Sequence, residues 1–202
     1  MATDAENVVP IDGRAARSAR TRAGIVEALI ALLDEGSVQP TVEEIAARAG
    51  VAPRTVFQHY ADREALFAAV SEYQVRRVAP LLERLPDEGP VDARLDALVQ
   101  QRARVYEAIT SVRRAALLME PFSEHTSGML AATREAKRRD VERIFGAEIA
   151  ARPTDEQPLL RAALGAAASW STWDALRRQQ GLDVERAAAA MRHALRALLV
   201  AR

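Results

Sequence analysis

Apolar side chains recur at helical spacing through most of this 202-residue chain. Ile25, Leu29, Leu32 and Leu33, for example, follow the i, i+4, i+7, i+8 pattern of one helix face. Alanine, the best helix former, supplies about a fifth of the residues, whereas aromatic residues, which favour strands, supply 4%. We therefore expect an all-α protein of about nine helices.

Glycine, proline and capping residues mark where these helices should begin and end. Gly36 and Gly50 suit helix C-termini, Pro53 suits a first turn, and Gly89 with Pro90 suits a hinge. The expected helices span approximately residues 14–35, 41–49, 53–60, 62–85, 95–109, 112–119, 123–149, 159–180 and 183–200.

Charge and composition exclude several classes of protein. Lysine plus arginine and aspartate plus glutamate both number 28. The net charge therefore gives no information about a nucleic-acid partner, and any basic surface must be local. The chain has no cysteine, which excludes disulfides and thiolate metal sites and suits a reducing compartment. No apolar run reaches the ~18 residues of a membrane span, and no secretory segment is visible. We expect a cytoplasmic protein with no membrane partner.

Two helical segments joined by a tight turn lie within residues 41–60. Thr41 suits a helix N-cap, and Glu44 three residues later completes a capping box. Gly50 ends this helix, and Pro53 opens the next one only two residues further on. This arrangement is a helix-turn-helix, whose second helix enters the major groove of DNA with its N-terminal residues at the base edges.

A close resemblance to a known family is carried by the string TVEEIAARAGVAPRTVFQHYADREALF, residues 41–67. It resembles the DNA-binding signature of the tetracycline-repressor (TetR) family of bacterial transcriptional regulators. The matching residues are Thr41, Ile45, Ala46, Ala49, Gly50, Val51, Thr55, Val56, Phe57, His59, Tyr60, Asp62, Arg63, Glu64 and Leu66. The resemblance implies a helix-turn-helix DNA-binding domain over 14–61 and a ligand-binding and dimerisation domain over 62–202. Residues 1–13 mix charged residues with Pro10 and Gly13 without a helical period, so we expect a flexible arm there.

The start of the third helix holds the candidates for reading DNA sequence. Arg54 can donate two hydrogen bonds to guanine, and Thr55 can meet a base edge or a phosphate. Gln58, one turn after Arg54, can pair with adenine or be plain solvated surface. Ala52 stands at the N-cap, where it cannot accept a backbone hydrogen bond. The arginines of 14–22 either reach an adjacent groove or form a solvated helix face.

The resemblance places phosphate contacts at Thr41, His59 and Arg63. Each is chemically suited, as a hydroxyl at a helix start, an imidazole and a guanidinium. Phe57 stands where relatives often carry a tyrosine, so one hydroxyl donor to the DNA backbone is missing. Tyr60 either packs under the domain or turns its hydroxyl outward toward DNA.

A single helix-turn-helix contacts too little DNA for useful affinity, so we expect a homodimer with recognition helices about 34–36 Å apart. Helices 159–180 and 183–200 are the candidates for its interface, and the resemblance implies a four-helix interface. An ordinary intramolecular core is the alternative. The expected interface residues are Leu160, Leu164, Ala167, Ser171, Val184, Ala188, Met191, Leu195 and Leu198.

The second half of the chain holds most of the aromatic and methionine side chains of its helices, and polar residues interrupt the apolar helix faces there. This combination suggests a pocket for a small-molecule effector. Simple core packing is the alternative for most of them. Arg102 falls on a face that ought to be buried, so it pairs with a carboxylate such as Glu120, extends to solvent, or binds an anionic or polar ligand. The pocket candidates are Tyr73, Arg102, Tyr106, Met119, Phe122, His125, Met129, Trp170 and Trp173.

No catalytic, metal or cofactor motif is found. The three histidines, His59, His125 and His193, have no partner at i+4, and no nucleophile elbow, phosphate loop or dinucleotide fingerprint occurs. We interpret the chain as a homodimeric TetR-like regulator without enzymatic activity, most often a repressor. It would bind a palindromic double-stranded operator and release it when a small effector binds. The alternatives are a helical ligand-binding or interaction module that has lost DNA binding and, less favoured, a small all-α enzyme.

Overall fold

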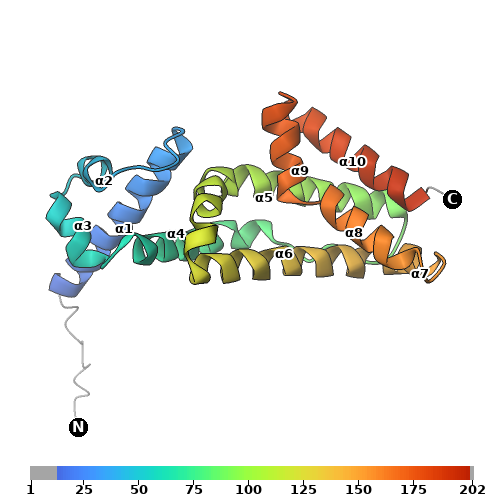
Figure 1. The fold of residues 1–202 in the computed structure, drawn as a ribbon, viewed down its shortest axis with the longest axis horizontal. Coiled ribbons are helices and arrows are strands. Elements are labelled where there is room, and N and C mark those ends of the chain that lie inside the picture. Colours follow the sequence, from blue (N-terminus) through green and yellow to red (C-terminus); the bar gives the residue numbers. More distant parts are fainter. Residues whose placement is uncertain (1–12, 201–202) are drawn as a thin grey trace, which may run out of the picture. The chain divides into compact units, whose positions relative to one another are not determined.

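The structure is a computed structural model that describes residues 13–200, and every regular element in this range is helical (Figure 1). The prediction of an all-α fold is confirmed. The expected flexible arm over 1–13 lies outside the described residues except for Gly13. The α-helices are α1 (Gly13–Asp34), α2 (Val42–Ala49), α3 (Pro53–His59), α4 (Arg63–Val78), α5 (Val91–Met119), α6 (Glu124–Ile144), α7 (Gly146–Ala150), α8 (Gln157–Ala167), α9 (Trp170–Asp174) and α10 (Val184–Val200).

The chain divides into two compact units after Val70, inside α4. We call residues up to 70 the N-terminal unit and residues 71–202 the C-terminal unit. Short 3₁₀ turns follow α4 and α5, at Ala79–Leu81 and Glu120–Phe122, and a π-helical turn follows α9 at Ala175–Gln179. None of the described helices has the length and apolar content to cross a membrane.

The N-terminal unit is built around the apolar face of α1. Ile25 and Leu29 have no exposed surface, and Ile45 of α2 and Val56 of α3 are each 3% exposed. Helix α1 contacts α2, and α2 contacts α3. The helix-turn-helix is thus held by a shared apolar core that leaves the opposite side of α3 in solvent.

Local capping sets the start and end of α2 as the sequence predicts. The Thr41 hydroxyl accepts from the Glu44 N–H at 3.2 Å, and the Glu44 carboxylate accepts from the Thr41 N–H at 2.7 Å. These hydrogen bonds, led by the one from the Thr41 backbone, hold the pKa of Glu44 below its usual value. Gly50 ends the helix with φ of 67°, a left-handed conformation that glycine adopts without strain.

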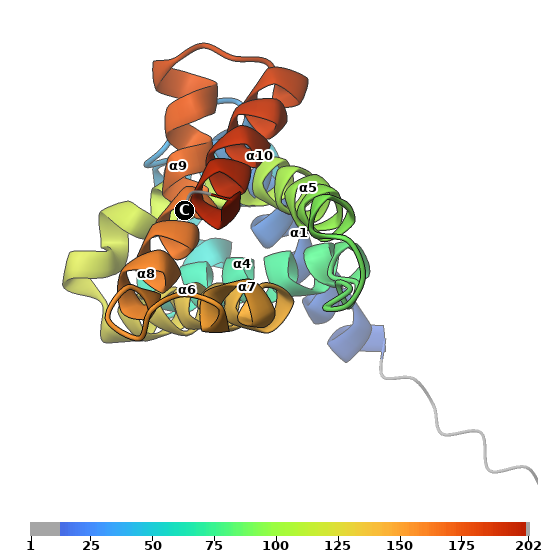
Figure 2. The ribbon, with the colours of Figure 1, turned by 90° about the vertical axis from the view of Figure 1, so that its right-hand side faces the viewer.

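In the C-terminal unit α5 is one continuous helix of 29 residues, so the predicted break between 109 and 112 is wrong. No glycine or proline occurs there, and the Thr110 hydroxyl donates to the Tyr106 carbonyl at 2.6 Å without ending the helix. In Figure 2 α10 lies beside α5 and α8, and α8 lies beside α6. The core of the unit is enclosed by these four helices and α9.

Two other long helices expected from the sequence are divided. The expected helix over 159–180 breaks at Ser169, whose extended backbone and side chain cap α9 by accepting from the Thr172 N–H at 3.1 Å. The expected helix over 123–149 breaks at Phe145, which is fully buried and precedes a glycine, a residue that weakens helices. In both places a local cap or glycine outweighs the helical pattern.

Candidate nucleic-acid interface and C-terminal unit

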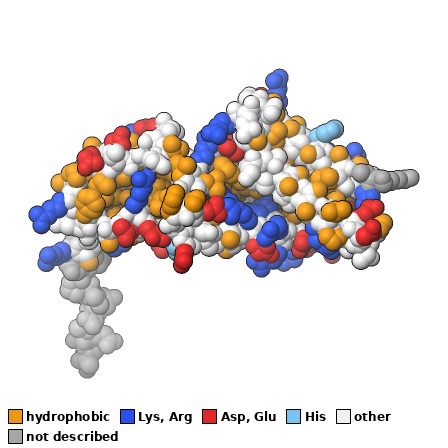
Figure 3. Space-filling view, viewed as in Figure 1, with side chains coloured by type: hydrophobic (Ala, Val, Ile, Leu, Met, Phe, Trp, Pro, Cys, Tyr) orange, Lys and Arg blue, Asp and Glu red, His pale blue; other side chains and the backbone are white. Residues whose placement is uncertain are grey.

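Helix α3 presents one polar and aromatic face to solvent. Arg54 and Gln58 are exposed, Phe57 is 57% exposed and Thr55 is half-buried. Val56 points to the core, so the rotation of α3 about its axis is fixed by packing. In Figure 3 separate basic side chains lie at the end of the N-terminal unit where α3 and the start of α1 lie, and acidic side chains lie over α2.

The first turn of α3 lacks a side-chain cap. Ala52 occupies the N-cap with φ of −73° and ψ of 148°, the extended conformation that capping residues adopt. Its methyl group accepts no hydrogen bond, and Pro53 at the next position removes one unpaired N–H. The Thr55 N–H donates to the Ala52 carbonyl at 2.8 Å, so the Arg54 N–H is the backbone donor of this turn that can face a phosphate.

Restoring the cap is expected to stabilise the N-terminal unit. Ala52→Ser should raise the free energy of unfolding by about 0.5–2 kcal/mol, because a hydroxyl at this position can accept from the exposed N–H groups of the first turn. Urea unfolding followed by circular dichroism measures the change. Ala47→Ser, at an exposed position inside α2, is the matched control and should be neutral or slightly destabilising. Equal effects of the two substitutions would contradict the missing cap.

The expected phosphate contacts differ in how accessible they are. Thr41 is exposed, but its hydroxyl also donates to the Glu44 carboxylate at 3.0 Å and is therefore engaged in the cap. His59 is half-buried at the last position of α3. Arg63 is exposed in the first turn of α4, with its guanidinium carbon 5.5 Å from the centre of the Phe67 ring. Arg63 has the freest access to a DNA backbone of these three.

Tyr60 lies inside the N-terminal unit and not on its surface. The side chain is 4% exposed, and its hydroxyl donates to the Arg22 carbonyl of α1 at 3.0 Å. The Arg22 guanidinium carbon also lies 5.2 Å from the centre of the Tyr60 ring. Of the two alternatives for Tyr60, the structure favours packing under the domain, and Tyr60 is removed from the candidate DNA contacts because its hydroxyl is bonded to α1.

Three of the expected dimer-interface residues are unavailable to a second chain. Leu164, Met191 and Leu195 have no exposed surface in the single chain and belong to its own core. They are removed from the candidate interface, because a side chain already covered by its own fold cannot contact a partner. The remaining candidates divide into half-buried Leu160, Ala167, Ala188 and Leu198, and exposed Ser171 and Val184. Helical spacing did not single out Leu159, which is 71% exposed at the start of α8.

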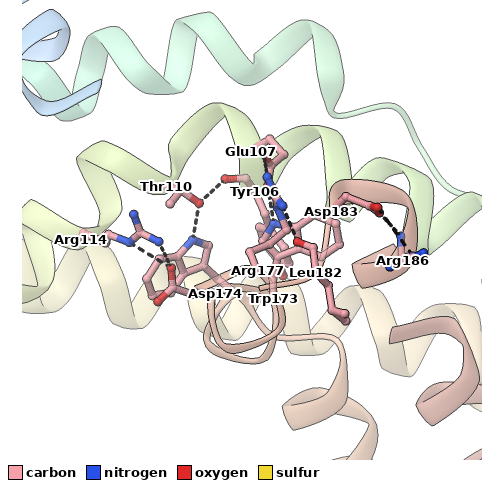
Figure 4. Close-up of polar contacts among 11 residues, drawn as sticks. Tyr106, Glu107, Thr110, Arg114, Trp173, Asp174, Arg177, Leu182, Asp183 and Arg186 are labelled. Atoms are coloured by element: carbon pink, nitrogen blue, oxygen red, sulfur yellow. Dashed lines mark hydrogen bonds and ion pairs between the residues drawn. The ribbon is translucent and has the colours of Figure 1, made fainter. Parts of the chain in front are cut away.

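The aromatic pocket candidates of α5 and α9 form a packed, hydrogen-bonded cluster (Figure 4). Tyr106 is 2% exposed and donates its hydroxyl to the Ala168 carbonyl at 2.8 Å. Trp173 is fully buried, and its indole N–H donates to the Glu107 carboxylate at 2.8 Å. Burial raises the pKa of the Tyr106 hydroxyl above its usual value. For these side chains the structure favours the core alternative.

Ion pairs at the edge of this cluster join α5 to α9 and to the π-helical turn. The Arg177 guanidinium donates to the Glu107 carboxylate at 2.9 Å and Arg114 donates to Asp174 at 3.0 Å, as Figure 4 shows. The Arg177 hydrogen bond, with a smaller contribution from Trp173, lowers the pKa of Glu107. The indole N–H of Trp170, another pocket candidate, donates to Thr110 at 3.0 Å.

The other pocket candidates do not line a common cavity. Phe122 is 88% exposed, His125 is exposed, and Tyr73, Met119 and Met129 are half-buried. A hollow of about 420 Å³ in the C-terminal unit is bordered instead by the segment after α4, by α5 and by α6. None of the nine candidates is among its lining residues, although Arg102 binds two of the residues that are.

Arg102 is almost completely buried and pairs across to α6. Its Nη2 donates to the Lys137 carbonyl at 3.2 Å and lies 3.4 Å from the Asp140 carboxylate. The carboxylate named from the sequence, Glu120, pairs instead with Arg134 at 2.7 and 2.8 Å. Arg102 and Glu120 therefore bind different partners and do not come together in a common site.

Comparison with known proteins agrees with the geometry of the N-terminal unit. Residues 25–70 match the family model described as bacterial regulatory proteins, tetR family. This segment runs from the buried face of α1 through α2 and α3 into α4. A search of curated proteins finds no match to the sequence.

Several solved structures share the fold over most of the chain. A transcriptional regulator from Rhodococcus sp. Rha1 has a TM-score of 0.65 and 20% identity, over 90% of this chain and 95% of its own. A tetR-family regulator from Streptomyces coelicolor has a TM-score of 0.65 and 18% identity, over 89% and 80%. A SmeT–triclosan complex has a TM-score of 0.59 and 22% identity, over 88% and 91%. Taken with the exposed recognition helix, the family match identifies residues 25–70 as a DNA-binding domain of the tetR family, and the solved structures show that the chain has the fold of transcriptional regulators.

Proposed function

We propose that this regulator is a homodimeric repressor that binds a palindromic operator through α3 and releases it when a small molecule binds the C-terminal unit. DNA binding is supported by the exposed face of α3, because the buried side chain of Val56 fixes the rotation of this helix about its axis. Two such helices related by a two-fold axis would enter successive major grooves.

The side chains on this face suit base recognition. Arg54 would donate to guanine, Gln58 would pair with adenine, and Thr55 would meet a base edge or phosphate near the helix start. The ring of Phe57, more than half exposed, would contact a thymine methyl group. Thr41, His59 and Arg63 would position the unit on the phosphates.

The dimer interface would be formed by the outward faces of α8 and α10. Leu159, Ala162 and Ala166 of α8 and Ala189 and Ala197 of α10 are exposed in the single chain. Small side chains allow helices to approach closely, and Leu159 supplies apolar area that a second copy would cover. This set replaces the buried residues that helical periodicity had suggested.

Ligand-induced release requires a small molecule that binds two arrangements of the dimer with different affinity. One structure with a similar fold is titled as a complex with triclosan, which supports a small-molecule effector. Helix α4 belongs to both units and is their covalent connection. A ligand that alters α4 would change the spacing of the recognition helices, and a coupling of about 1–3 kcal/mol is typical of such systems.

Two arginine substitutions separate base reading from phosphate binding. Arg54→Ala is expected to cost about 1–3 kcal/mol of binding free energy and to relax the base preference at one position of each half-site. Arg63→Ala should weaken binding to all sequences by a similar factor and reduce the slope of affinity against salt concentration. Fluorescence anisotropy with duplexes flanking the protein's own gene, at several salt concentrations, measures both.

Arg104→Ala is the matched control, because Arg104 is an exposed arginine of α5 in the C-terminal unit. It should leave both affinity and salt slope unchanged. An unaltered salt slope for Arg63→Ala would exclude its phosphate contact. Failure of the unsubstituted protein to bind any fragment would favour the alternative function, a ligand-binding module that has lost DNA binding.

A further inference from the structure

The hollow of about 420 Å³ in the C-terminal unit has a polar wall and an apolar wall. The polar wall includes Gln101 of α5 with Lys137 and Asp140 of α6, and Leu82 and Leu85 supply apolar surface from the segment after α4. A space of this size accommodates a small organic molecule. It is separate from the aromatic cluster of α5 and α9.

Arg102 lies directly behind the polar wall. The residue is 1% exposed, and its Nη2 binds the Lys137 carbonyl and the Asp140 carboxylate, which both border the hollow. Among the described residues, the buried Nε and Nη1 of this guanidinium have no hydrogen-bond partner. A buried charge with unpaired donors is costly, so this site lacks acceptor groups.

Lys137, the only lysine of the chain, adds a second positive charge to the same wall. Its ammonium nitrogen is 3.9 Å from Asp140 Oδ2, and Arg102 Nη2 is 3.4 Å from the same oxygen. Both separations exceed the ~2.7–2.9 Å of a charge-assisted hydrogen bond. Burial, and next the neighbouring Arg102, lower the pKa of Lys137 to about 8. The Asp140 carboxylate is therefore the shared counter-charge of Lys137 and Arg102, and it lies beyond charge-assisted hydrogen-bond distance of both.

The charges around the hollow leave one positive charge uncompensated. Arg84 and Arg143 both bind Asp87, at 3.4 and 2.9 Å. Three cations border the space and a fourth lies behind its wall, whereas two carboxylates border the space and a third pairs with the bordering arginines. The cations are Arg84, Arg102, Lys137 and Arg143, and the carboxylates are Glu83, Asp87 and Asp140.

We propose that this hollow binds a small organic carboxylate, whose carboxylate group accepts from Lys137 and is attracted by the charge of Arg102 behind the wall, and whose apolar part lies against Leu82 and Leu85. A bound carboxylate supplies the negative charge and the short acceptor distances that Asp140 does not provide. The apolar wall favours an organic anion over inorganic phosphate. Binding itself is independent of the proposed function, and only the role of this carboxylate as effector rests on it.

The single lysine makes the site directly observable. In protein labelled with ¹³C-lysine, sodium octanoate is expected to shift the one lysine side-chain signal saturably and to raise its titration midpoint above about 8. The other charged groups facing this lysine are Arg102 from α5, Asp140 and Arg143 from α6, and Glu83 and Arg84 from the segment after α4. Octanamide, which has the same chain but no charge, should leave the signal unshifted, and inorganic phosphate should bind more weakly than octanoate.

Calorimetric titration of variants tests the residues. Lys137→Gln should weaken octanoate binding about tenfold, whereas Lys137→Arg should largely retain it. Arg139→Gln, on the exposed side of α6, is the matched control and should bind as the unsubstituted protein does. Melting curves confirm that each variant is folded. Equal binding of octanamide, unchanged affinity of Lys137→Gln, or no saturable shift of the lysine signal would each overturn the proposal.

DNA binding measured with and without octanoate separates this inference from the proposed function. A lower DNA affinity with octanoate supports the carboxylate as effector. Saturable octanoate binding with unchanged DNA affinity supports the carboxylate site and overturns its effector role. Absence of DNA binding under all conditions overturns the proposed function, while the lysine signal still decides whether the site binds a carboxylate.

Discussion

Replacing Trp173 by alanine is expected to lower the free energy of unfolding by about 3–5 kcal/mol. Trp173 has no exposed surface, and its ring centre lies 6.3 Å from that of Tyr106. The substitution removes the largest fully buried side chain of the described residues and leaves a cavity where α9 meets α5. It also removes a donor from Glu107, although Arg177 continues to pair with that carboxylate.

Urea unfolding followed by circular dichroism measures this loss, and Trp170 remains as a fluorescent reporter. Trp173→Phe is the matched control, because it retains much of the ring volume but removes the indole N–H. It should cost clearly less than the alanine substitution. A loss below about 1 kcal/mol for Trp173→Ala would show that the aromatic cluster does not carry the packing assigned to it.

Removing the carboxylate of Glu148 is expected to cost about 2–3 kcal/mol of unfolding free energy. Its partner Arg94 is 5% exposed and also donates to the Gly89 carbonyl at 3.1 Å and to the Ile144 carbonyl. Glu148→Ala leaves that guanidinium buried without its counter-charge. The effect falls below that of a fully enclosed pair because the side chain of Glu148 is 19% exposed and water can partly replace it.

The same ion pair should make the C-terminal unit sensitive to acid. The Arg94 hydrogen bond holds the pKa of Glu148 below its ordinary value of 4.5. The pair therefore stabilises the fold fully above pH ~4.5, and this contribution is lost as the pH falls through the lowered pKa. Unfolding free energies measured from pH 7 downward should fall less steeply in Glu148→Ala than in the unsubstituted protein. Glu72→Ala, at an exposed site of α4, should keep the original slope and stability.

Features set by neighbouring residues were predictable from the sequence. The capping box of Thr41 and Glu44, the left-handed Gly50 and the proline at the start of α3 all depend on residues within one or two turns. Their spacing is sufficient to locate the helix-turn-helix. The missing cap at Ala52 was predictable for the same reason, because an alanine side chain accepts no hydrogen bond wherever it lies.

Features that depend on distant residues were not predictable in this way. Helical periodicity shows that Leu164, Met191 and Leu195 face something apolar, but not whether their own chain or a second one covers them. Tyr60 binds the Arg22 carbonyl, 38 residues earlier in the sequence. Only the packing of α3 against α1 decides whether its hydroxyl turns inward.

The same limit applies to the charged residues of the C-terminal unit. The sequence places Arg102 on an apolar face and leaves open whether it pairs, extends to solvent or binds a ligand, because its partners on α6 are 35 and 38 residues away. No local pattern distinguishes Asp140 from Glu120 as the carboxylate that faces it. Lys137 was noticeable as the only lysine, and its position three residues before Asp140 is the one sequence signal for a charged cluster there.

Selection of bound sequences from a random duplex library tests the central claim most directly. If α3 reads base edges as one of a two-fold pair, the enriched sequences should be inverted repeats whose half-site centres are one helical turn, about 10 base pairs, or a multiple of it apart. The Arg54→Ala protein should lose preference at one position in each half. Enrichment of no sequence, or of one without an inverted repeat, would contradict the account.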